Sequence, residues 1–246
     1  MPPFAELVTA TNFSFLRGAS HAEELVRQAH ALGLRGLGVA DRNTLAGVVR
    51  AHSAAREVGL EVRVGTRLVL ADGTPDLVAW PTDRAAYGRL CRLLTLGNRR
   101  AKKGGCELSL QDLIDGGEGL LMAFAPVPSG RTAPLVAPLR RLHEAFPGNV
   151  WLAARMGHGG ADRKHLGALA ALGEEHGVRL FATNDVLYHA AARRELQDVV
   201  TCIREGTTLA AAGRLLEPNA ERHLKGAAEM ARLFRDLPEA VAETES

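Results

Sequence analysis

Strand-like apolar segments alternate with amphipathic helical segments along most of this chain, and that alternation restricts its fold more than any other feature. Apolar segments of strand length occur at residues 6–9, 36–40, 61–70, 76–80, 119–124, 150–154 and 178–183. Amphipathic segments of helix length occur at residues 21–32, 44–58, 83–96, 135–145, 162–176 and 191–204. Strands that alternate with helices of about a dozen residues are typical of βαβ units built around parallel strands.

This order of segments predicts an α/β fold in the form of a closed or nearly closed barrel of the TIM type. An open doubly wound sheet is the alternative, and it is disfavoured because no Gly-x-Gly-x-x-Gly sequence follows the first predicted strand. We expect the barrel domain to span residues 1–208. Residues 209–246 depart from the alternation and predict a C-terminal helical extension, whose last helix stops soon after it begins, as in a piece of a longer chain.

Composition and charge exclude several classes of protein. Hydrophobic residues make up 46% of the 246 residues and aromatic residues only 4%, so the core should consist mainly of Ala, Leu and Val. The formal charge of +2 gives no overall argument for nucleic-acid binding. Cys91, Cys106 and Cys202 form no CxxC pair, and the chain has neither a signal peptide nor an apolar span of about 20 residues. These features predict a cytoplasmic protein that does not enter a membrane.

Polar residues near the carboxyl ends of the predicted strands mark a candidate site, because these ends carry the active sites of TIM-type barrels. Asp41 follows the second predicted strand, Asp185 follows the seventh, and Asp76 begins the fourth. His189 is the histidine nearest to this end, and a structural hydrogen-bonding role is favoured for it over a place in the pocket. Hydrolytic multi-metal sites use many converging His and carboxylate ligands, so two carboxylates alone would hold a cation weakly.

Three arginines, Arg17, Arg42 and Arg67, lie near the same strand ends. A guanidinium group stays protonated and has no lone pair to give to a metal. At roughly 4 Å and an effective dielectric constant of about 20, each would repel a unit positive charge by about 4 kcal/mol. The residues therefore favour a pocket of Arg–Asp ion pairs without metal over a weak residual metal site.

A basic stretch around residue 100 is a second candidate site. Its candidate contacts to DNA or to a partner are Arg99, Arg100, Lys102 and Lys103. Clusters of this kind contact phosphates and add salt-dependent affinity, although charge runs are more often solvated faces. No aromatic stacking residues are interleaved, which argues against a dedicated single-strand binder.

Five segments carry a resemblance to a known family: TNFSFLRGASHAEELVRQA, GLGVADRNTLAGVVRAH, RLFATNDVLYH, LQDVVTCIREG and NAERHLKGAAEMARLF. Together they resemble the N-terminal polymerase-and-histidinol-phosphatase (PHP) domain of bacterial C-family DNA polymerases. The similarity is closer to the error-prone branch than to the replicative polymerase III alpha subunit, and it extends from about residue 4 to about residue 234.

The resemblance implies a distorted (β/α)7 barrel whose active members bind up to three metals for phosphoester hydrolysis. The family's ligand positions fall on Val8, Ala10, Arg17, Asp41, Arg42, Arg67, Asp185 and Leu187, and more loosely on Asp76. Only Asp41 and Asp185 clearly keep a ligand side chain. These residues, with His189, form the predicted remnant of a metal pocket, which we expect to hold no metal or other cofactor and to be catalytically inactive.

The resemblance also implies a parent enzyme, an error-prone DNA polymerase that transfers nucleotides across lesions in DNA repair after damage. Its Mg²⁺-binding polymerase aspartates would lie in a domain beyond residue 246, and this domain would give structural support. The implied partners are the rest of the polymerase chain, DNA through the full-length protein, the sliding clamp and an accessory Y-family-like lesion-bypass protein.

Two other functions stay open from the sequence. The first is a free-standing metal-dependent phosphoesterase of the same fold, with metals held by Asp41, Asp76, Asp185 and His189. The second is a regulatory module that binds a small anion through Arg17, Arg42 and Arg67. A measurement of bound metal would distinguish the phosphoesterase from the inactive domain.

Overall fold

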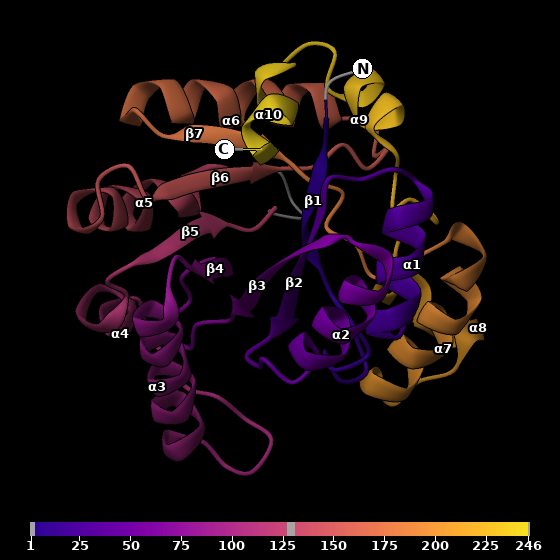
Figure 1. Cartoon of the computed structure of the whole chain (residues 1–246), viewed down its shortest axis with the longest axis horizontal. Helices are drawn as coiled ribbons and strands as arrows, with labels where there is room; N and C mark the ends of the chain where they lie inside the picture. The colour runs from indigo at the N-terminus through magenta and orange to yellow at the C-terminus, as the bar shows by residue number, and fades with distance from the viewer. Residues whose placement is uncertain (1–2, 127–130, 246) are drawn as a thin grey trace.

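The strands form one curled sheet that follows the order of the sequence (Figure 1). The structure, a computed structural model, describes residues 3–126 and 131–245, and within these residues it has seven strands. Their bounds are β1 Ala5–Thr9, β2 Gly36–Arg42, β3 Glu61–Leu68, β4 Leu77–Pro81, β5 Leu120–Phe124, β6 Val150–Ala154 and β7 Arg179–Ala182. Each strand overlaps one of the predicted strand segments.

Strand β4 is the exception to the parallel sheet that the alternation predicts. It pairs antiparallel with both β3 and β5, whereas all the other neighbouring strands are parallel. The reason is the short connection over residues 69–76, which contains no helix, because a parallel return would need a crossover of a dozen or more residues. Reversal places the start of β4, and with it Asp76, at the end where the parallel strands finish.

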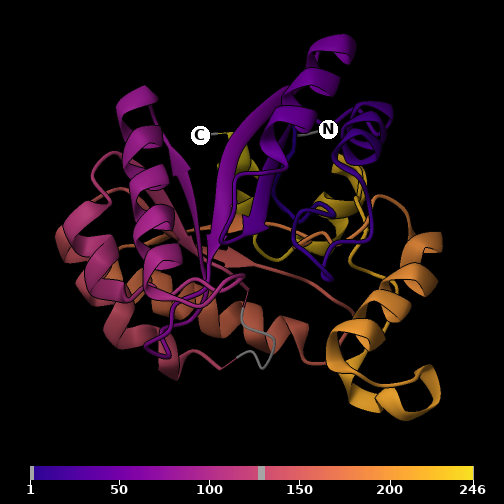
Figure 2. The same cartoon turned by 90° about the horizontal axis from the view of Figure 1, so that it is seen from below.

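The sheet closes at one end through a contact between its two edge regions. Val186, just after β7, accepts a hydrogen bond from the Ala10 N–H and donates one to the Val8 carbonyl, both at 2.9 Å. Seen from below, the helices surround the curled sheet (Figure 2). The arrangement confirms the distorted barrel with its C-terminal helical extension, and it excludes the open doubly wound alternative.

The helices connect the strands and continue beyond the last of them. Among the described residues they are α1 Ala22–Ala31, α2 Val48–Val58, α3 Arg84–Arg100, α4 Leu110–Gly116, α5 Ala133–Ala145, α6 Asp162–His176, α7 Arg194–Glu205, α8 Leu209–Ala212, α9 Ala227–Leu233 and α10 Glu239–Ala242. Short 3₁₀ turns occupy Ala191–Arg193, Gly213–Leu215 and Glu243–Glu245. Helix α4 has no counterpart in the predicted segments. None of the helices in the described part of the chain is long and apolar enough to cross a membrane.

Two helices begin later than their sequence pattern predicts. Helix α2 begins at Val48 rather than Thr44, because the Thr44 side chain closes a turn by accepting from the Ala46 N–H at 3.2 Å. Helix α1 is capped at His21, whose N–H donates to the Glu24 carboxylate at 2.9 Å. At Thr44 the polar side chain forms a turn in place of the first helical turn, and at His21 the residue serves as the cap before the helix.

The C-terminal extension packs back onto the barrel. Met230, Phe234 and Val241 are buried in the same apolar cluster as residues of α1 and α2. The Thr244 hydroxyl accepts a hydrogen bond from the Ala5 N–H of β1 at 3.2 Å. Small apolar residues, together with Trp80 and Phe181, form the apolar cluster inside the barrel. This core leaves the carboxyl ends of the strands as the place where polar side chains gather.

Candidate functional site

The candidate site is a pocket of about 150 Å³ at the carboxyl ends of the strands. Eight of the residues predicted from sequence line it: Val8, Ala10, Arg17, Arg42, Arg67, Asp76, Asp185 and Leu187. The lining residues that sequence reasoning missed are Ser14, Ala40, Gln197, Thr201, Arg204, Leu215, Glu217 and Arg222. The first set comes from strand ends and the segments next to them, and most of the second comes from the chain after β7, the last strand.

Asp185 is held by two arginines at once. It follows β7 in a left-handed backbone conformation with φ of 49°, and its N–H donates to the Thr183 hydroxyl at 2.9 Å. Arg67 donates through Nη2 to the Asp185 Oδ1 atom. Arg222 Nη2 lies 2.5 Å from Oδ2. Both oxygens of this buried carboxylate therefore face guanidinium groups.

The charges around Asp185 decide its protonation state. Burial alone would raise the pKa of Asp185, but the positive charges of Arg222 and Arg67 outweigh burial and hold the pKa below its usual range. Arg155, which is partly buried, acts in the same direction. The carboxylate is therefore ionised at neutral pH, with its charge fully met by arginine.

Arg222 reaches the pocket from the loop before α9 and joins three acceptors. Its Nε donates to the Asp185 carbonyl oxygen at 2.8 Å, and its Nη1 lies 2.7 Å from the Glu217 carboxylate. Burial alone would lower the pKa of Arg222, but Asp185 and Glu217 outweigh it and raise the pKa. Because Arg222 does not follow a strand, the strand-end rule could not identify it.

Arg17 and Arg42 differ from the paired arginines, because neither forms an ion pair within the described residues. Burial, followed by the nearby charges of Arg42 and Arg204, lowers the pKa of Arg17 to about 10. Burial also lowers the pKa of Arg42, while Asp76 acts against it. Asp76 lies 3.7 Å from Arg67 and is the most exposed carboxylate of the pocket at 34%. The pocket thus holds partly desolvated positive charge.

Asp41 does not line the pocket, contrary to the sequence interpretation. It is fully buried, and its side chain accepts from the Thr11 N–H and hydroxyl and from the Ser14 hydroxyl at 2.7–2.8 Å. Burial raises the pKa of Asp41 despite these hydrogen bonds. The expected ion pair is absent from the described residues, because the loop after β1 supplies neutral donors instead.

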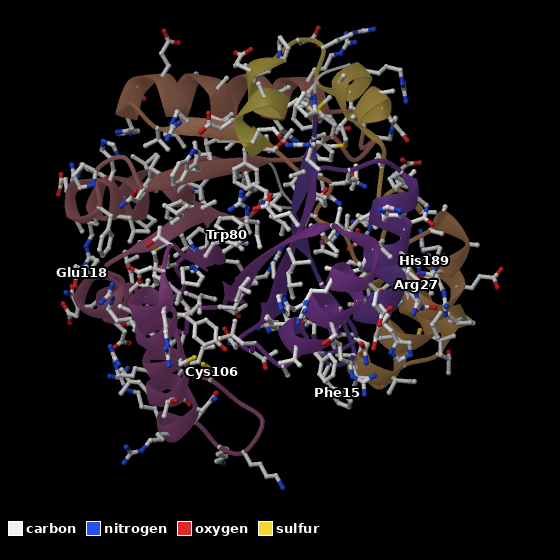
Figure 3. All side chains as sticks on the ribbon, in the orientation of Figure 1. Phe15, Arg27, Trp80, Cys106, Glu118 and His189 are labelled. Atoms are coloured by element: carbon white, nitrogen blue, oxygen red, sulfur yellow. The ribbon has the colours of Figure 1, made fainter. Side chains whose placement is uncertain are left out.

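His189 also lies outside the pocket lining, on the side of α1 and α7 (Figure 3). Its N–H donates to the Ser20 hydroxyl at 3.0 Å, and its ring Nδ1 lies 2.8 Å from the same oxygen. The Ser20 hydroxyl, directly before the α1 cap residue His21, therefore serves this long-range contact. Burial lowers the pKa of His189. The structural role favoured from sequence is the one that the contacts describe.

Helix α7 turns a polar face to the pocket and an apolar face outward. Gln197, Thr201 and Arg204 line the pocket. Leu196, Val199 and Ile203, which we call the α7 apolar face, are exposed, Ile203 to 61%. Spacings of four and three residues put the polar set on one side of a helix, so the sequence did contain a signal for it.

The basic stretch lies at the end of α3 and in the loop after it, which extends away from the barrel (Figure 1). Arg99, Lys102 and Lys103 are exposed. Arg100 is engaged by Asp112 of α4 at 2.7 Å. The structure thus presents three of the four predicted residues freely to solvent, and contact with DNA stays a prediction.

Comparison with known families decides what this barrel is. Residues 6–142 match the family described as PHP domain, more than half of the chain. The chain belongs to the PHP family. Error-prone DNA polymerases are similar to it along nearly its whole length: those of Brucella abortus and Rhodopseudomonas palustris are 53% and 50% identical over 99% of this chain. The chain spans only 23% and 22% of those two polymerases.

Solved structures show the same PHP-like fold at low sequence identity. A candidate metal-dependent phosphoesterase from Bifidobacterium adolescentis has a TM-score of 0.55 and 17% identity, covering 75% of this chain and 88% of that one. An amidohydrolase from Chromobacterium violaceum, solved with sulfate and without metal, has a TM-score of 0.52 and 17% identity, covering 72% and 84%. These similarities establish the fold alone.

The residues of this PHP pocket do not fit a catalytic metal cluster. No three His, Cys, Asp or Glu side chains within residues 3–126 and 131–245 come together in a way that could hold a metal ion. Two positions keep a ligand side chain. The Asp41 carboxylate accepts hydrogen bonds from Thr11 and Ser14, and both oxygens of the Asp185 carboxylate are paired with arginine. The described residues of the pocket therefore do not provide the ligands that metal-assisted catalysis would need.

Proposed function

We propose that this chain is a catalytically inactive, metal-free PHP domain that gives structural support to an error-prone DNA polymerase. The observation that carries the proposal is the pairing of Asp185 with both Arg67 and Arg222. A cation placed at Asp185 would meet two fixed positive charges, each repelling a unit charge by about 4 kcal/mol at roughly 4 Å. The two guanidinium groups supply the charge compensation that metals supply in an active site.

The parent protein would be a DNA-directed DNA polymerase that carries out translesion synthesis in the damage response. Support comes from the similarity to error-prone polymerases along 99% of the chain. Nucleotide transfer, with its Mg²⁺, would belong to the part of the polymerase outside the matched region. The partners proposed on the same basis are that remaining chain, DNA held by the whole protein, the sliding clamp and an accessory Y-family-like protein, in the cytoplasm.

The α7 apolar face supports a structural role, because an exposed apolar stripe is typical of a docking surface. Phe15, 80% exposed, lies next to Leu16, whose carbonyl accepts from Arg204 of α7 at 2.9 Å. An apolar loop thus adjoins the helix. In a full-length polymerase, Ile203→Glu should lower the melting temperature while leaving that of the isolated chain unchanged. Val136→Glu, at an exposed position of α5, is the matched control and should change neither.

A phosphoester hydrolysis assay tests the proposed inactivity. The isolated chain, supplied with Mn²⁺ or Zn²⁺, should hydrolyse neither a phosphomonoester nor the 3′ end of a DNA strand above the buffer rate. Metal-dependent turnover that is lost in Asp185→Asn would favour the free-standing phosphoesterase instead. That alternative needs Asp41 and His189 in the site, and both lie outside the pocket lining.

A further inference from the structure

We propose that the pocket at the strand ends is an anion site in which Arg17 and Arg42 bind a small dianion of the phosphate class. The inference rests on the proposed metal-free state, because metal ions would occupy the same space. It goes beyond structural support by giving the pocket a ligand.

Positive charge exceeds negative charge in the pocket lining. Five arginines, Arg17, Arg42, Arg67, Arg204 and Arg222, face three carboxylates, Asp76, Asp185 and Glu217. Arg67 pairs with Asp76 and Asp185, and Arg222 pairs with Asp185 and Glu217, so all three carboxylates are paired. Arg204 pairs with Glu205 of its own helix at 2.8 Å. The charge left without a partner lies on Arg17 and Arg42.

Arg17 and Arg42 are both half-buried and lie close enough to repel each other. Their lowered pKa values reflect burial and neighbouring positive charge, and Arg17 at about 10 is still a cation at neutral pH. Fixing two such charges in one pocket is costly unless an opposite charge is present. A bound dianion would accept hydrogen bonds from both guanidinium groups, whose planar forks match phosphate oxygens.

Gln197 gives an independent indication that the pocket binds a ligand. It lines the pocket and is only 2% exposed, yet its side-chain Oε1 has no hydrogen-bond partner. Buried polar groups of this kind are normally satisfied. Rotation of the amide by 180° would place the NH₂ group where Oε1 now lies and allow it to donate to an anion. The Thr201 hydroxyl, one helical turn away, is a further donor in the lining.

The pocket size restricts the ligand. A volume of about 150 Å³ is comparable to an engineered cavity that holds one benzene molecule. A phosphate group therefore fits inside, whereas an attached nucleoside would have to extend into solvent. Free inorganic phosphate and the terminal phosphate of a nucleotide share this chemistry, and their affinities distinguish the two sources.

Isothermal titration calorimetry of the whole chain at fixed ionic strength tests the proposal. The probes are inorganic phosphate, dAMP and, as a monoanion control, acetate. We expect saturable binding of one phosphate per chain, at least tenfold weaker in Arg17→Gln and in Arg42→Gln. Arg56→Gln, at an exposed position of α2, should bind as the unaltered chain does. Asp76→Asn removes a repelling carboxylate and should tighten binding, which gives a gain-of-affinity readout that misfolding cannot imitate.

The outcomes separate this inference from the proposed function. Tighter binding of dAMP than of phosphate would identify a nucleotide source, and equal or weaker binding would identify the free ion. Absence of saturable phosphate binding, or equal affinity in all the arginine variants, would overturn the anion site. Metal content measured on the same sample keeps the two apart: metal-free protein without phosphate binding refutes the anion site alone, whereas bound metal refutes the proposed function.

Discussion

Asp185 and Arg222 are joined twice: the carboxylate Oδ2 lies 2.5 Å from Nη2, and the Asp185 carbonyl accepts from Nε at 2.8 Å. Arg222 therefore fixes both the side chain and the backbone at the end of β7. Because Arg222 comes from a segment 37 residues further along the chain, the contact ties the C-terminal extension to the barrel mouth. The Asp185 carboxylate, a predicted metal-ligand position, is thereby part of a tertiary ion pair.

Substitution of Asp185 tests this role against a second buried aspartate. Asp185→Asn should destabilise the chain by about 3 kcal/mol, at the lower end of the range of about 3–5 kcal/mol for breaking a buried pair, since Arg222 keeps Glu217. Asp41→Asn breaks hydrogen bonds from neutral donors only and should cost about 1 kcal/mol. Urea unfolding measures both, and equal losses would contradict the pairing.

Glu6 of β1 predicts an unusual dependence of stability on pH. It is fully buried, and burial raises its pKa from 4.5 to about 7 despite hydrogen bonds from Thr183 and from the Asn184 N–H. The folded state therefore binds the proton more tightly than the unfolded state does. The Glu6 contribution is fully present below pH 4.5 and is lost as the pH rises to about 7, by about 3 kcal/mol.

Comparison of the chain with Glu6→Gln isolates this contribution. The unfolding free energy of the unaltered chain, measured from pH 4.5 to pH 7.5, should fall relative to that of the variant across the window. A constant difference between the two would show that Glu6 does not titrate there. Asp185 acts the other way, since its lowered pKa gives stability that is lost only as the pH falls through that lower value.

The lack of a side chain at Gly47 provides the room in which the Asp41 carboxylate lies. A methyl group on Gly47 would lie 2.3 Å from the Asp41 Oδ2 atom and 2.7 Å from the Thr11 hydroxyl oxygen. Gly47→Ala should therefore destabilise the chain by roughly 1–3 kcal/mol. Gly167→Ala in α6, where no atom lies within 4 Å, should stabilise it by up to about 1 kcal/mol. Thermal unfolding of both variants decides whether close packing at Asp41 causes the loss.

The loop after α3 predicts a salt effect in a full-length polymerase. If Lys102 and Lys103 each contact a DNA phosphate, replacing one by Ala should reduce the slope of log affinity against log salt by about 1. Lys164→Ala, at an exposed position of α6, should leave the slope unchanged. Fluorescence anisotropy at several salt concentrations gives the slopes, and identical slopes for all the variants would assign the loop to a solvated face.

Half of the residues that line the pocket could be predicted from sequence, because strand ends gather at one edge of a barrel. This rule predicted Arg42, Arg67 and Asp185, and all three line the pocket. It also reached Asp76, but for a different reason, since β4 runs antiparallel and its start lies at that edge. The positions of the strands and the approximate bounds of six helices, α1–α3 and α5–α7, followed in the same way from periodicity.

The remaining features depend on contacts between distant segments, which periodicity does not report. Asp41 is at a strand end, yet the loop containing Thr11 and Ser14 folds over it. Arg222 enters from beyond the barrel, and no local pattern connects it to Asp185. Ser20, directly before α1, contacts His189, 169 residues away.

Metal content is the most direct test of the central claim that arginine has replaced metal at the end of β7. The chain, purified without chelator, should contain well below one equivalent of Zn, Mn and Fe by elemental analysis. Its melting temperature should not change after treatment with chelator. One or more tightly held ions per chain, lost together with stability on chelation, would contradict the account.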